Sequence, residues 1–204
     1  MARVEIDPNA PLVCRVETRV TAPAVVERAC ELYARAFDQI SSETPILQIL
    51  YTSEELEGVL ANEDYVKFMV HAGERGPLVG LCMLSAKLSE ALHSYWNPEW
   101  IRRRFPEAAE RGVLFYVNII AVDPDVQGVG VAIKLVEEAV RFVAAHDGTV
   151  FFDASEHYNG GLPKTIKRYG EQLDLDIGVE TLDAQVYLAL TQKPRERPEP
   201  GGSG

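Results

Sequence analysis

One stretch, from Val113 to Ala132, constrains the fold of this 204-residue chain more than any other. An apolar run ends at Val122, and two glycines, Gly128 and Gly130, then open a long amphipathic segment. This order is typical of a strand, a short loop and the N-terminus of a helix. The first turn of a helix leaves backbone N–H groups without intrahelical partners, and their dipoles sum to a partial positive charge. Because glycine has no Cβ, a bulky anion can approach this backbone closely, which predicts a cradle for a phosphate or pyrophosphate.

The spacing Gln127-x-x-Gly130-x-Ala132 resembles the Q/R-x-x-G-x-G/A motif of the GNAT superfamily of N-acetyltransferases. Val122 and Pro124 stand where a V-x-P usually precedes that motif. In that family the loop holds the pyrophosphate of acetyl-CoA, and the pantetheine arm bonds the backbone at the end of the preceding strand. The resemblance therefore implies acetyl-CoA as co-substrate. It implies cofactor contacts at Ile120, Ala121, Val122, Gln127, Gly128, Val129, Gly130, Val131, Ala132 and Asn159.

A dinucleotide-binding loop is the alternative reading of the same glycines. It would need a small residue at position 133, where this chain has Ile133. The residues from Asp123 to Gln127 also separate the strand from the glycines, where the dinucleotide fingerprint has a tight turn. Asp153 ends the next expected strand at a suitable distance for a ribose contact, so a nucleotide-binding protein stays open as an alternative.

Hydrophobic periodicity and turn residues predict the other elements. A strand–helix–strand unit from Val113 to Ala154 predicts two parallel strands joined by a right-handed crossover. Thr21 and Ser53 are the expected N-caps of the first two helices. The expected strands are Leu12–Val20, Tyr65–Ala72, Leu78–Lys87, Val113–Val122, Thr149–Ala154, Leu175–Thr181 and Ala184–Thr191; the expected helices are Thr21–Phe37, Ser53–Ala61, Gly128–His146 and Pro163–Tyr169.

This element order matches the GNAT family and implies an α+β (α/β/α) fold. Its mixed central sheet would have about seven strands, splayed between strands 4 and 5, with about four flanking helices. The expected organisation is an N-terminal arm at residues 1–10, one acyltransferase domain at 11–192 and a disordered tail at 193–204. Residues 88–112, rich in Trp, Pro and Arg, are expected to form an insertion that shapes the acceptor side of the domain.

Composition limits the classes of function. A net charge of −11 disfavours nucleic-acid binding and is compatible with a cationic acceptor. The sequence has no apolar run long enough to span a membrane and no apolar leader, so a cytoplasmic protein is expected. The three cysteines, Cys14, Cys30 and Cys82, are scattered and predicted to be reduced. The sequence has no Cys/His cluster, so no metal site is expected.

Acyl transfer to an amine requires a neutral amine, a stabilised oxyanion and a proton for the thiolate. If the strand from Val113 is regular, Tyr116 and Asn118 share one face, while Phe115, Val117, Ile119 and Ala121 share an apolar one. Many GNAT members have a glutamate about where Tyr116 stands. The resemblance thus makes Tyr116 and Asn118 candidate catalytic residues; tyrosine is a poor base near neutral pH.

The short helix departs from the family pattern N-x-x-A-x-x-x-Y, whose tyrosine protonates the thiolate. Asn159 matches the first place, but Leu162 replaces the small residue and Ile166 stands where the tyrosine belongs. Tyr169 lies nearly one turn further on and is the candidate replacement acid.

Together these features predict an acyl-CoA-dependent N-acetyltransferase that acts on a small-molecule or peptide amine in a direct ternary complex. The alternative from another class is a catalytically silent acyl-CoA-binding domain used for sensing or assembly. A homodimer is expected, because final strands in this family often pair between subunits and an exposed edge strand invites pairing.

Overall fold

The computed structural model describes residues 10–43, 51–91, 96–126, 128–154 and 161–183, with side chains of 39–43 excluded. Five strands form one sheet in the order β1-β2-β3-β4-β5. Their bounds are Leu12–Glu17 (β1), Tyr65–Ala72 (β2), Leu78–Ser85 (β3), Leu114–Val122 (β4) and Thr149–Phe151 (β5). Neighbouring strands are antiparallel except for β4 and β5, which are parallel, as the strand–helix–strand pattern predicted.

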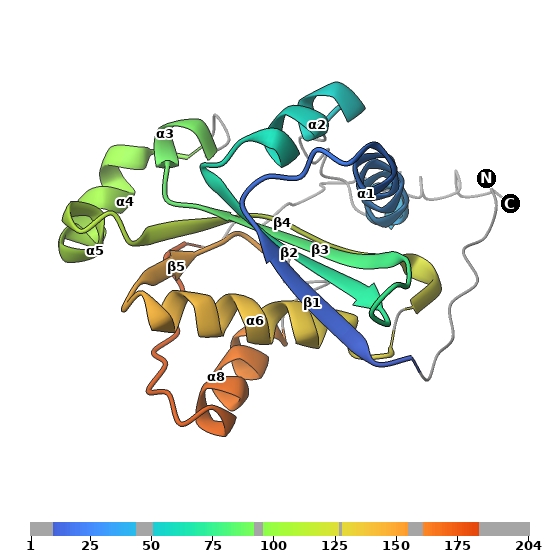
Figure 1. Cartoon of the computed structure of the whole chain (residues 1–204). Coiled ribbons are helices and arrows are strands. Elements are labelled where there is room, and N and C mark those ends of the chain that lie inside the picture. The colour runs from blue at the N-terminus through green and yellow to red at the C-terminus, as the bar shows by residue number, and fades with distance from the viewer. Residues whose placement is uncertain (1–9, 44–50, 92–95, 127, 155–160, 184–204) are drawn as a thin grey trace, which may run out of the picture.

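Helices cover both faces of the sheet, so the α+β architecture is confirmed (Figure 1). α1 (Pro23–Glu43) and α2 (Ser53–Ala61) lie on one face, and α6 (Val131–Ala145) lies on the other with α8 (Leu162–Gln172) beyond it. Three short helices, α3 (Leu88–Ala91), α4 (Pro98–Arg104) and α5 (Pro106–Glu110), occupy the segment expected to be an insertion. A 3-10 turn, η1 (Pro124–Val126), follows β4.

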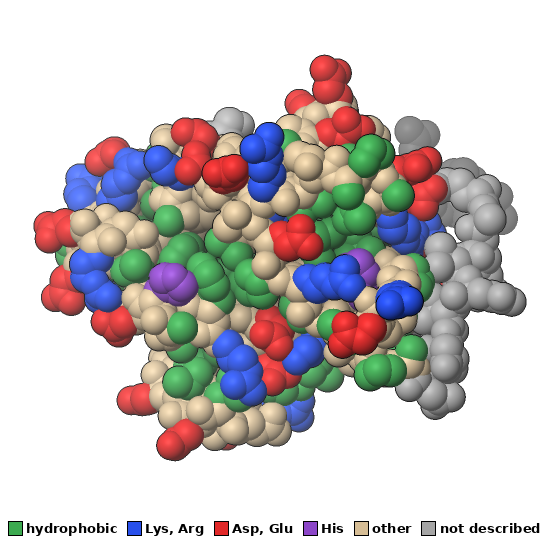
Figure 2. All heavy atoms as spheres, viewed as in Figure 1, with side chains coloured by type: hydrophobic (Ala, Val, Ile, Leu, Met, Phe, Trp, Pro, Cys, Tyr) green, Lys and Arg blue, Asp and Glu red, His purple; other side chains and the backbone are tan. Residues whose placement is uncertain are grey.

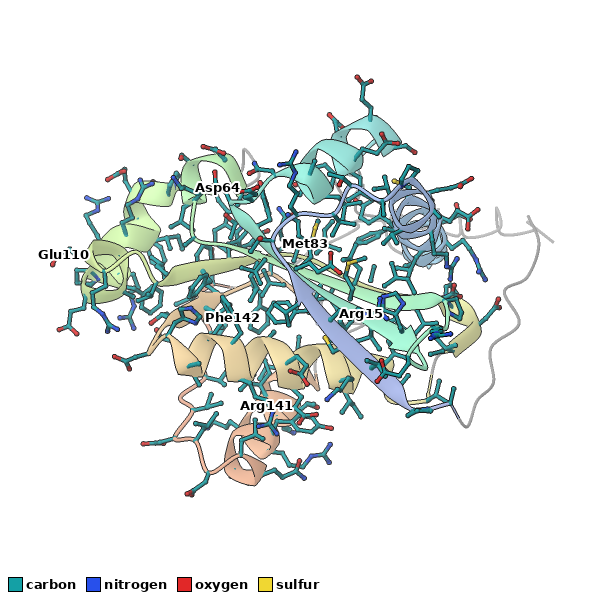
Figure 3. The ribbon with its side chains drawn as sticks, viewed as in Figure 1. Arg15, Asp64, Met83, Glu110, Arg141 and Phe142 are labelled. Carbon is teal, nitrogen blue, oxygen red and sulfur yellow. The ribbon has the colours of Figure 1, made fainter. Side chains whose placement is uncertain are left out.

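The sequence of α6 explains why it packs on the sheet. Leu135, Val136 and Val143 are buried on one side, while Glu137 and Arg141 form the expected i,i+4 pair with 2.8 Å between nitrogen and oxygen. Figure 3 shows Phe142 pointing from α6 toward the sheet and Arg141 pointing away from it. Acidic and basic side chains lie intermixed over β1 and α6 in Figure 2.

Two tight contacts hold the start of α6 and the start of β5 in place. A Cβ at Gly80 in β3 would lie 2.5 Å from Val131, so only glycine allows the first turn of α6 to lie this close to the sheet. A Cβ at Gly148 would lie 2.9 Å from Phe115 and from the carbonyl of Val113. These small residues therefore set where the helix and the parallel strand meet β4.

Some element boundaries differ from the expected ones. Thr52, not Ser53, caps α2, because its hydroxyl accepts from the Glu55 N–H while the Glu55 carboxylate accepts from the Thr52 N–H. α1 begins at Pro23 and continues to Glu43, beyond the expected end at Phe37.

One of the two expected C-terminal strands falls within the described residues. Residues 175–181, expected to be a strand, have no regular secondary structure, so the part of the sheet that is described has fewer strands than expected. The other expected strand, Ala184–Thr191, lies outside the described residues, as do the arm at 1–9 and the tail at 193–204. Within the described ranges, no helix has the length and apolar character needed to cross a membrane.

Candidate active site

Strands β4 and β5 separate after a short parallel pairing. Only Leu114, Phe115 and Tyr116 of β4 pair with β5, opposite Thr149, Val150 and Phe151. β4 continues to Val122 while β5 ends at Phe151, so the second half of β4 has no β5 partner within the described residues. We call the point of separation at Tyr116 and Phe151 the fork. The splay expected between these strands is therefore present.

A β-bulge follows the fork directly. Met83 of β3 pairs with Ile119 and Leu84 pairs with Val117, so Asn118 is the extra residue on β4. A bulge exchanges the two faces of the strand beyond it. Phe115 and Val117 accordingly pack on the α6 side, whereas Ile119 and Ala121 pack on the α1 side. The expectation that these four share one face was wrong, because it assumed an uninterrupted strand.

Backbone groups of β4 beyond the bulge face the open side of the fork. The Asp123 N–H donates to Val79 of β3 at 2.9 Å. Since backbone groups of successive residues point to opposite edges of a strand, those of Ala121 point toward β3 and those of Ile120 and Val122 point toward the fork. Of the three predicted pantetheine contacts, Ile120 and Val122 thus offer their backbone groups to an extended ligand.

The glycine loop leads from β4 into α6. Gly128 and Gly130 have φ values of +89° and +87°, in the left-handed region that glycine adopts without strain. A Cβ at either position would meet nothing within 4 Å, so the loop borders open space. The Lys134 N–H donates to Gly130 at 2.9 Å as the first bond of α6, and the backbone N–H groups of Val131, Ala132 and Ile133 precede it.

The described part of the glycine loop and the first turn of α6 are thus open, and the pyrophosphate contacts there stay a prediction. Val129 is 41% exposed and Ala132 is also exposed, while Val131 packs into the core against β3. Gln127 and Asn159, two further predicted cofactor contacts, lie outside the described residues. The glycine loop, the backbone of β4 and the fork form a continuous path along one edge of β4.

A buried ionic cluster anchors the beginning of the glycine loop. Asp123 is fully buried and bonds Arg28 of α1, and Arg35 contacts the same carboxylate at 3.1 Å. Arg35 also pairs with Asp125 at 2.8 Å, and this hydrogen bond raises the pKa of the Arg35 guanidinium. The Asp125 N–H donates to Asp123 at 3.0 Å. The cluster ties α1 to the segment that follows β4, which the sequence pattern predicted only as a short loop.

The fork places a hydroxyl beside a carboxylate. The Tyr116 hydroxyl donates to Asp153 Oδ1 at 2.7 Å, from a ring that is 1% exposed. Asp153 is exposed and follows the end of β5. The sequence pattern indicated Asp153 only as a possible ribose ligand; the predicted parallel pairing of β4 and β5 is the signal that places it next to Tyr116.

Residues from the segment at 88–112 reach both sides of the fork. Trp96 packs edge-on against Tyr116 and Phe151, with ring centroids 6.2 and 5.6 Å apart. The Asn118 amide donates to the Ala91 carbonyl at 3.0 Å and to the hydroxyl of Tyr51 at 3.0 Å. Asn118 is thus held between this segment and the residues before α2, and both predicted strand residues lie at the fork.

Tyr169, the third candidate catalytic residue, lies on α8. This helix packs against α6, and in Figure 1 it lies beyond α6 as seen from the sheet. The Arg168 guanidinium lies 5.7 Å from the centre of the Tyr169 ring, and the catalytic role of Tyr169 stays a prediction. Ile166 occupies the neighbouring turn of the same helix.

The cysteines are poor nucleophiles. Burial raises the pKa of Cys14 to about 11 and that of Cys82 to about 12, and burial also raises the pKa of Cys30. Among the described residues, no group of three or more His, Cys, Asp or Glu side chains has the arrangement of a metal site.

The sequence matches no protein-family model and no curated protein. Its fold is similar to a putative acetyltransferase from Pyrococcus horikoshii, at 16% identity and a TM-score of 0.51, over 78% of this chain and 88% of that one. It is also similar to an aminoglycoside acetyltransferase from an uncultured soil metagenomic sample, at 16% identity and a TM-score of 0.50, over 91% of this chain and 100% of that one. At these identities the likeness shows the fold alone: the described part of the chain has the fold of these acetyltransferase structures.

Proposed function

We propose that this chain is an acyl-CoA-dependent N-acyltransferase that uses acetyl-CoA and transfers the acyl group to an amine. The observation that carries the proposal is the path along β4: a fork at Tyr116, a bulge at Asn118 and a glycine loop at the N-terminus of α6. This path joins a site for an extended chain to a site for a pyrophosphate. Bound acetyl-CoA would supply an activated thioester at the fork.

The residues of the chain fit this co-substrate. Gly128 and Gly130 leave open space over the loop, and the first-turn N–H groups of α6 carry partial positive charge toward it. Ile120 and Val122 offer backbone donors and acceptors to the amide groups of a pantetheine arm. The loop is held in place by the Asp123 cluster, so little order has to be gained on binding.

At the fork, Tyr116 and Asp153 orient the acceptor. The tyrosine donates its proton to Asp153, and this pair of side chains would bind the N–H groups of the incoming amine. Asp153, which is exposed, adds negative charge that attracts an ammonium and connects the fork to water. The amine proton then leaves by way of this carboxylate and water, and positioning supplies most of the rate.

Direct attack in a ternary complex is favoured over an acyl-cysteine. A thiol whose pKa is raised to about 11 or 12 holds very little thiolate near neutral pH, and the thiolate is the nucleophile. Cys82 is fully buried within the sheet as well.

The experiment is a two-step measurement on the full chain. Calorimetry with acetyl-CoA, longer acyl-CoAs and NAD tests the ligand class, and thiol release with a panel of amines, followed by mass detection of the product, tests catalysis. Acetyl-CoA binding with amine-dependent thiol release supports the proposal. Binding without thiol release from any amine would favour the silent acyl-CoA-binding domain, and tight binding of NAD alone would favour the nucleotide-binding reading.

A further inference from the structure

A cavity of about 240 Å³ lies between α1 and α2, on the face of the sheet opposite α6. Its walls are mostly apolar or aromatic, and a carboxylate and a hydroxyl lie among them. We call it the aromatic pocket; its lining residues are Cys30, Tyr33, Ala34, Phe37, Asp38, Tyr51, Ser53 and Leu56.

Three aromatic rings form the walls. The rings of Tyr33 and Phe37 have centroids 4.5 Å apart, and those of Tyr33 and Tyr51 are 6.2 Å apart. The backbone N–H of Tyr51 donates to the Tyr33 hydroxyl at 3.1 Å, which ties the Tyr33 side chain to the chain segment before α2. Leu56 closes the floor and is 1% exposed. The pocket thus presents several π faces and an aliphatic surface in a fixed arrangement.

One wall residue of the aromatic pocket contacts β4 at the bulge. The hydroxyl of the wall residue Tyr51 lies 3.0 Å from the amide nitrogen of the bulge residue Asn118, which donates to it. The same hydroxyl lies 3.2 Å from the Asn118 amide oxygen, to which it can donate. Asn118 stands two residues beyond Tyr116 on β4, at the bulge that opens the path for the acyl group. A molecule in the aromatic pocket is therefore separated from the bulge by the Tyr51 side chain.

The charge around the aromatic pocket is negative. Asp38 lines it and is exposed. Burial is the main cause of the raised pKa of the Cys30 thiol, and the charge of Glu57 raises that pKa further. Burial likewise raises the pKa of the Tyr33 hydroxyl, and the charge of Glu55 adds to it. Aromatic faces together with a nearby carboxylate attract a cation with an apolar body.

We infer that the aromatic pocket binds the acceptor, and that the acceptor is a small primary amine carrying one apolar or aromatic group. This inference rests on the proposed function. The apolar group fills the space between Tyr33, Phe37 and Leu56, and the amine lies at the Tyr51–Asn118 end, facing the fork. The cavity lies below the roughly 300–1,000 Å³ typical of pockets for drug-sized ligands, so it admits one ring or short alkyl chain rather than a multi-ring polycation.

The test compares three acceptors at saturating acetyl-CoA: phenethylamine, hexylamine and the polyamine spermidine, with product mass as the readout. The two apolar monoamines should be acetylated with kcat/KM at least about tenfold above that of spermidine, the ratio of a binding difference of about 1.4 kcal/mol. Phenylethanol, which lacks the amine, should compete with phenethylamine only weakly. Preference for spermidine would overturn the inference.

Two variants and a matched control locate the effect in the aromatic pocket. Phe37→Leu keeps the apolar volume but removes one π face, and Asp38→Asn removes the rim charge; each should raise KM for phenethylamine about two- to tenfold and leave kcat nearly unchanged. Glu27→Gln removes a charge from the same face of α1 about 16 Å away and should leave KM unchanged.

Binding of acetyl-CoA to each variant separates this inference from the proposed function. Unaltered acetyl-CoA affinity together with an unaltered KM in both pocket variants would show that the acceptor binds elsewhere, while the proposed transfer reaction would stand. If the unmodified protein does not bind acetyl-CoA, the proposed function itself is refuted. Thermal melts confirm that each variant is folded before its KM is compared.

Discussion

The charge at the start of α6 offers a sharp test of the pyrophosphate cradle. Ala132 is exposed in the first turn of the helix, two residues after Gly130, which caps it. Unlike Gly128 and Gly130, it has ordinary helical backbone geometry, so a side chain can be added there without left-handed strain. Ala132→Glu places a negative charge beside the proposed anion site, and Ala132→Gln adds the same bulk without the charge.

The expected size of the effect follows from Coulomb's law. At a separation of about 7 Å, each charge of the pyrophosphate repels the new carboxylate by roughly 0.6 kcal/mol in water and roughly 2.4 kcal/mol at an effective dielectric of about 20. Screening in about 0.15 M salt reduces both values by roughly half. Two phosphate charges then give about 1 to 2 kcal/mol for a largely exposed site, which raises Kd for CoA about five- to thirtyfold relative to Ala132→Gln.

Stability should change in the opposite direction. A glutamate in the first turn interacts favourably with the helix dipole, by about 0.3–1 kcal/mol. The Tm of the free Ala132→Glu protein should therefore equal or exceed that of Ala132→Gln by a few degrees, about 2–4 °C per kcal/mol for a chain of this size. Weaker CoA binding together with an unchanged or higher Tm cannot come from a damaged fold.

Calorimetric titration with CoA at low and high salt is the assay. The difference in Kd between the two variants should shrink at about 1 M salt, where the screening length falls to about 3 Å. Equal Kd values for Ala132→Glu and Ala132→Gln at low salt would refute the assignment of this helix N-terminus as the pyrophosphate site.

Three further outcomes test the fork, the ionic cluster and a buried lysine. Tyr116→Phe should lower kcat about tenfold to a hundredfold with unchanged CoA affinity. If the two side chains act as one pair, adding Asp153→Asn to this variant should lower kcat little further. A loss beyond a thousandfold for Tyr116→Phe would make Tyr116 the principal acid–base group. Asp123→Asn removes the buried charge that pairs with the partly buried Arg28 and Arg35, and it should cost up to about 3–5 kcal/mol in chemical unfolding; a change below about 1 kcal/mol would contradict the proposed anchoring role. Burial lowers the pKa of Lys67 to about 8, so above that pH the unfolded chain binds more protons than the folded one. The free energy of unfolding of the wild type relative to Lys67→Met should therefore rise by up to about 1.4 kcal/mol per pH unit toward about pH 10. A difference that does not change with pH would contradict the lowered pKa.

Local sequence patterns predicted the elements around the site well. Apolar runs ended by Asp123-Pro124 and by Gly148 predicted β4 and β5, and the amphipathic repeat of α6 predicted which side meets the sheet. These features depend on neighbours within a few residues, because backbone preferences, capping and helical periodicity are local. Gly128 and Gly130 belong to the same class of evidence: a left-handed loop residue is most often glycine, and both adopt that conformation, while the anion cradle expected from them stays a prediction.

Errors arose where a distant partner decides the outcome. The bulge at Asn118 exists because β3 and β4 pair in register on both sides of it, and the exchange of faces that it causes cannot be read from β4 by itself. The N-cap of α2 moved by one residue to Thr52, where the reciprocal bond with Glu55 is completed. The strand expected at 175–181 has no regular structure among the described residues, although its apolar pattern suited a strand.

The sequence by itself determined that a strand, a glycine loop and a helix N-terminus follow one another, because each depends on residues adjacent in the chain. Only the tertiary structure decided which side chains meet at the fork. Tyr116 and Asp153 are 37 residues apart, and Tyr51 and Asn118 are 67 apart. Such pairs are set by strand register and helix packing, where burial of the two apolar faces selects one arrangement of the whole sheet. The chemistry of the site therefore depends on contacts that no local pattern records.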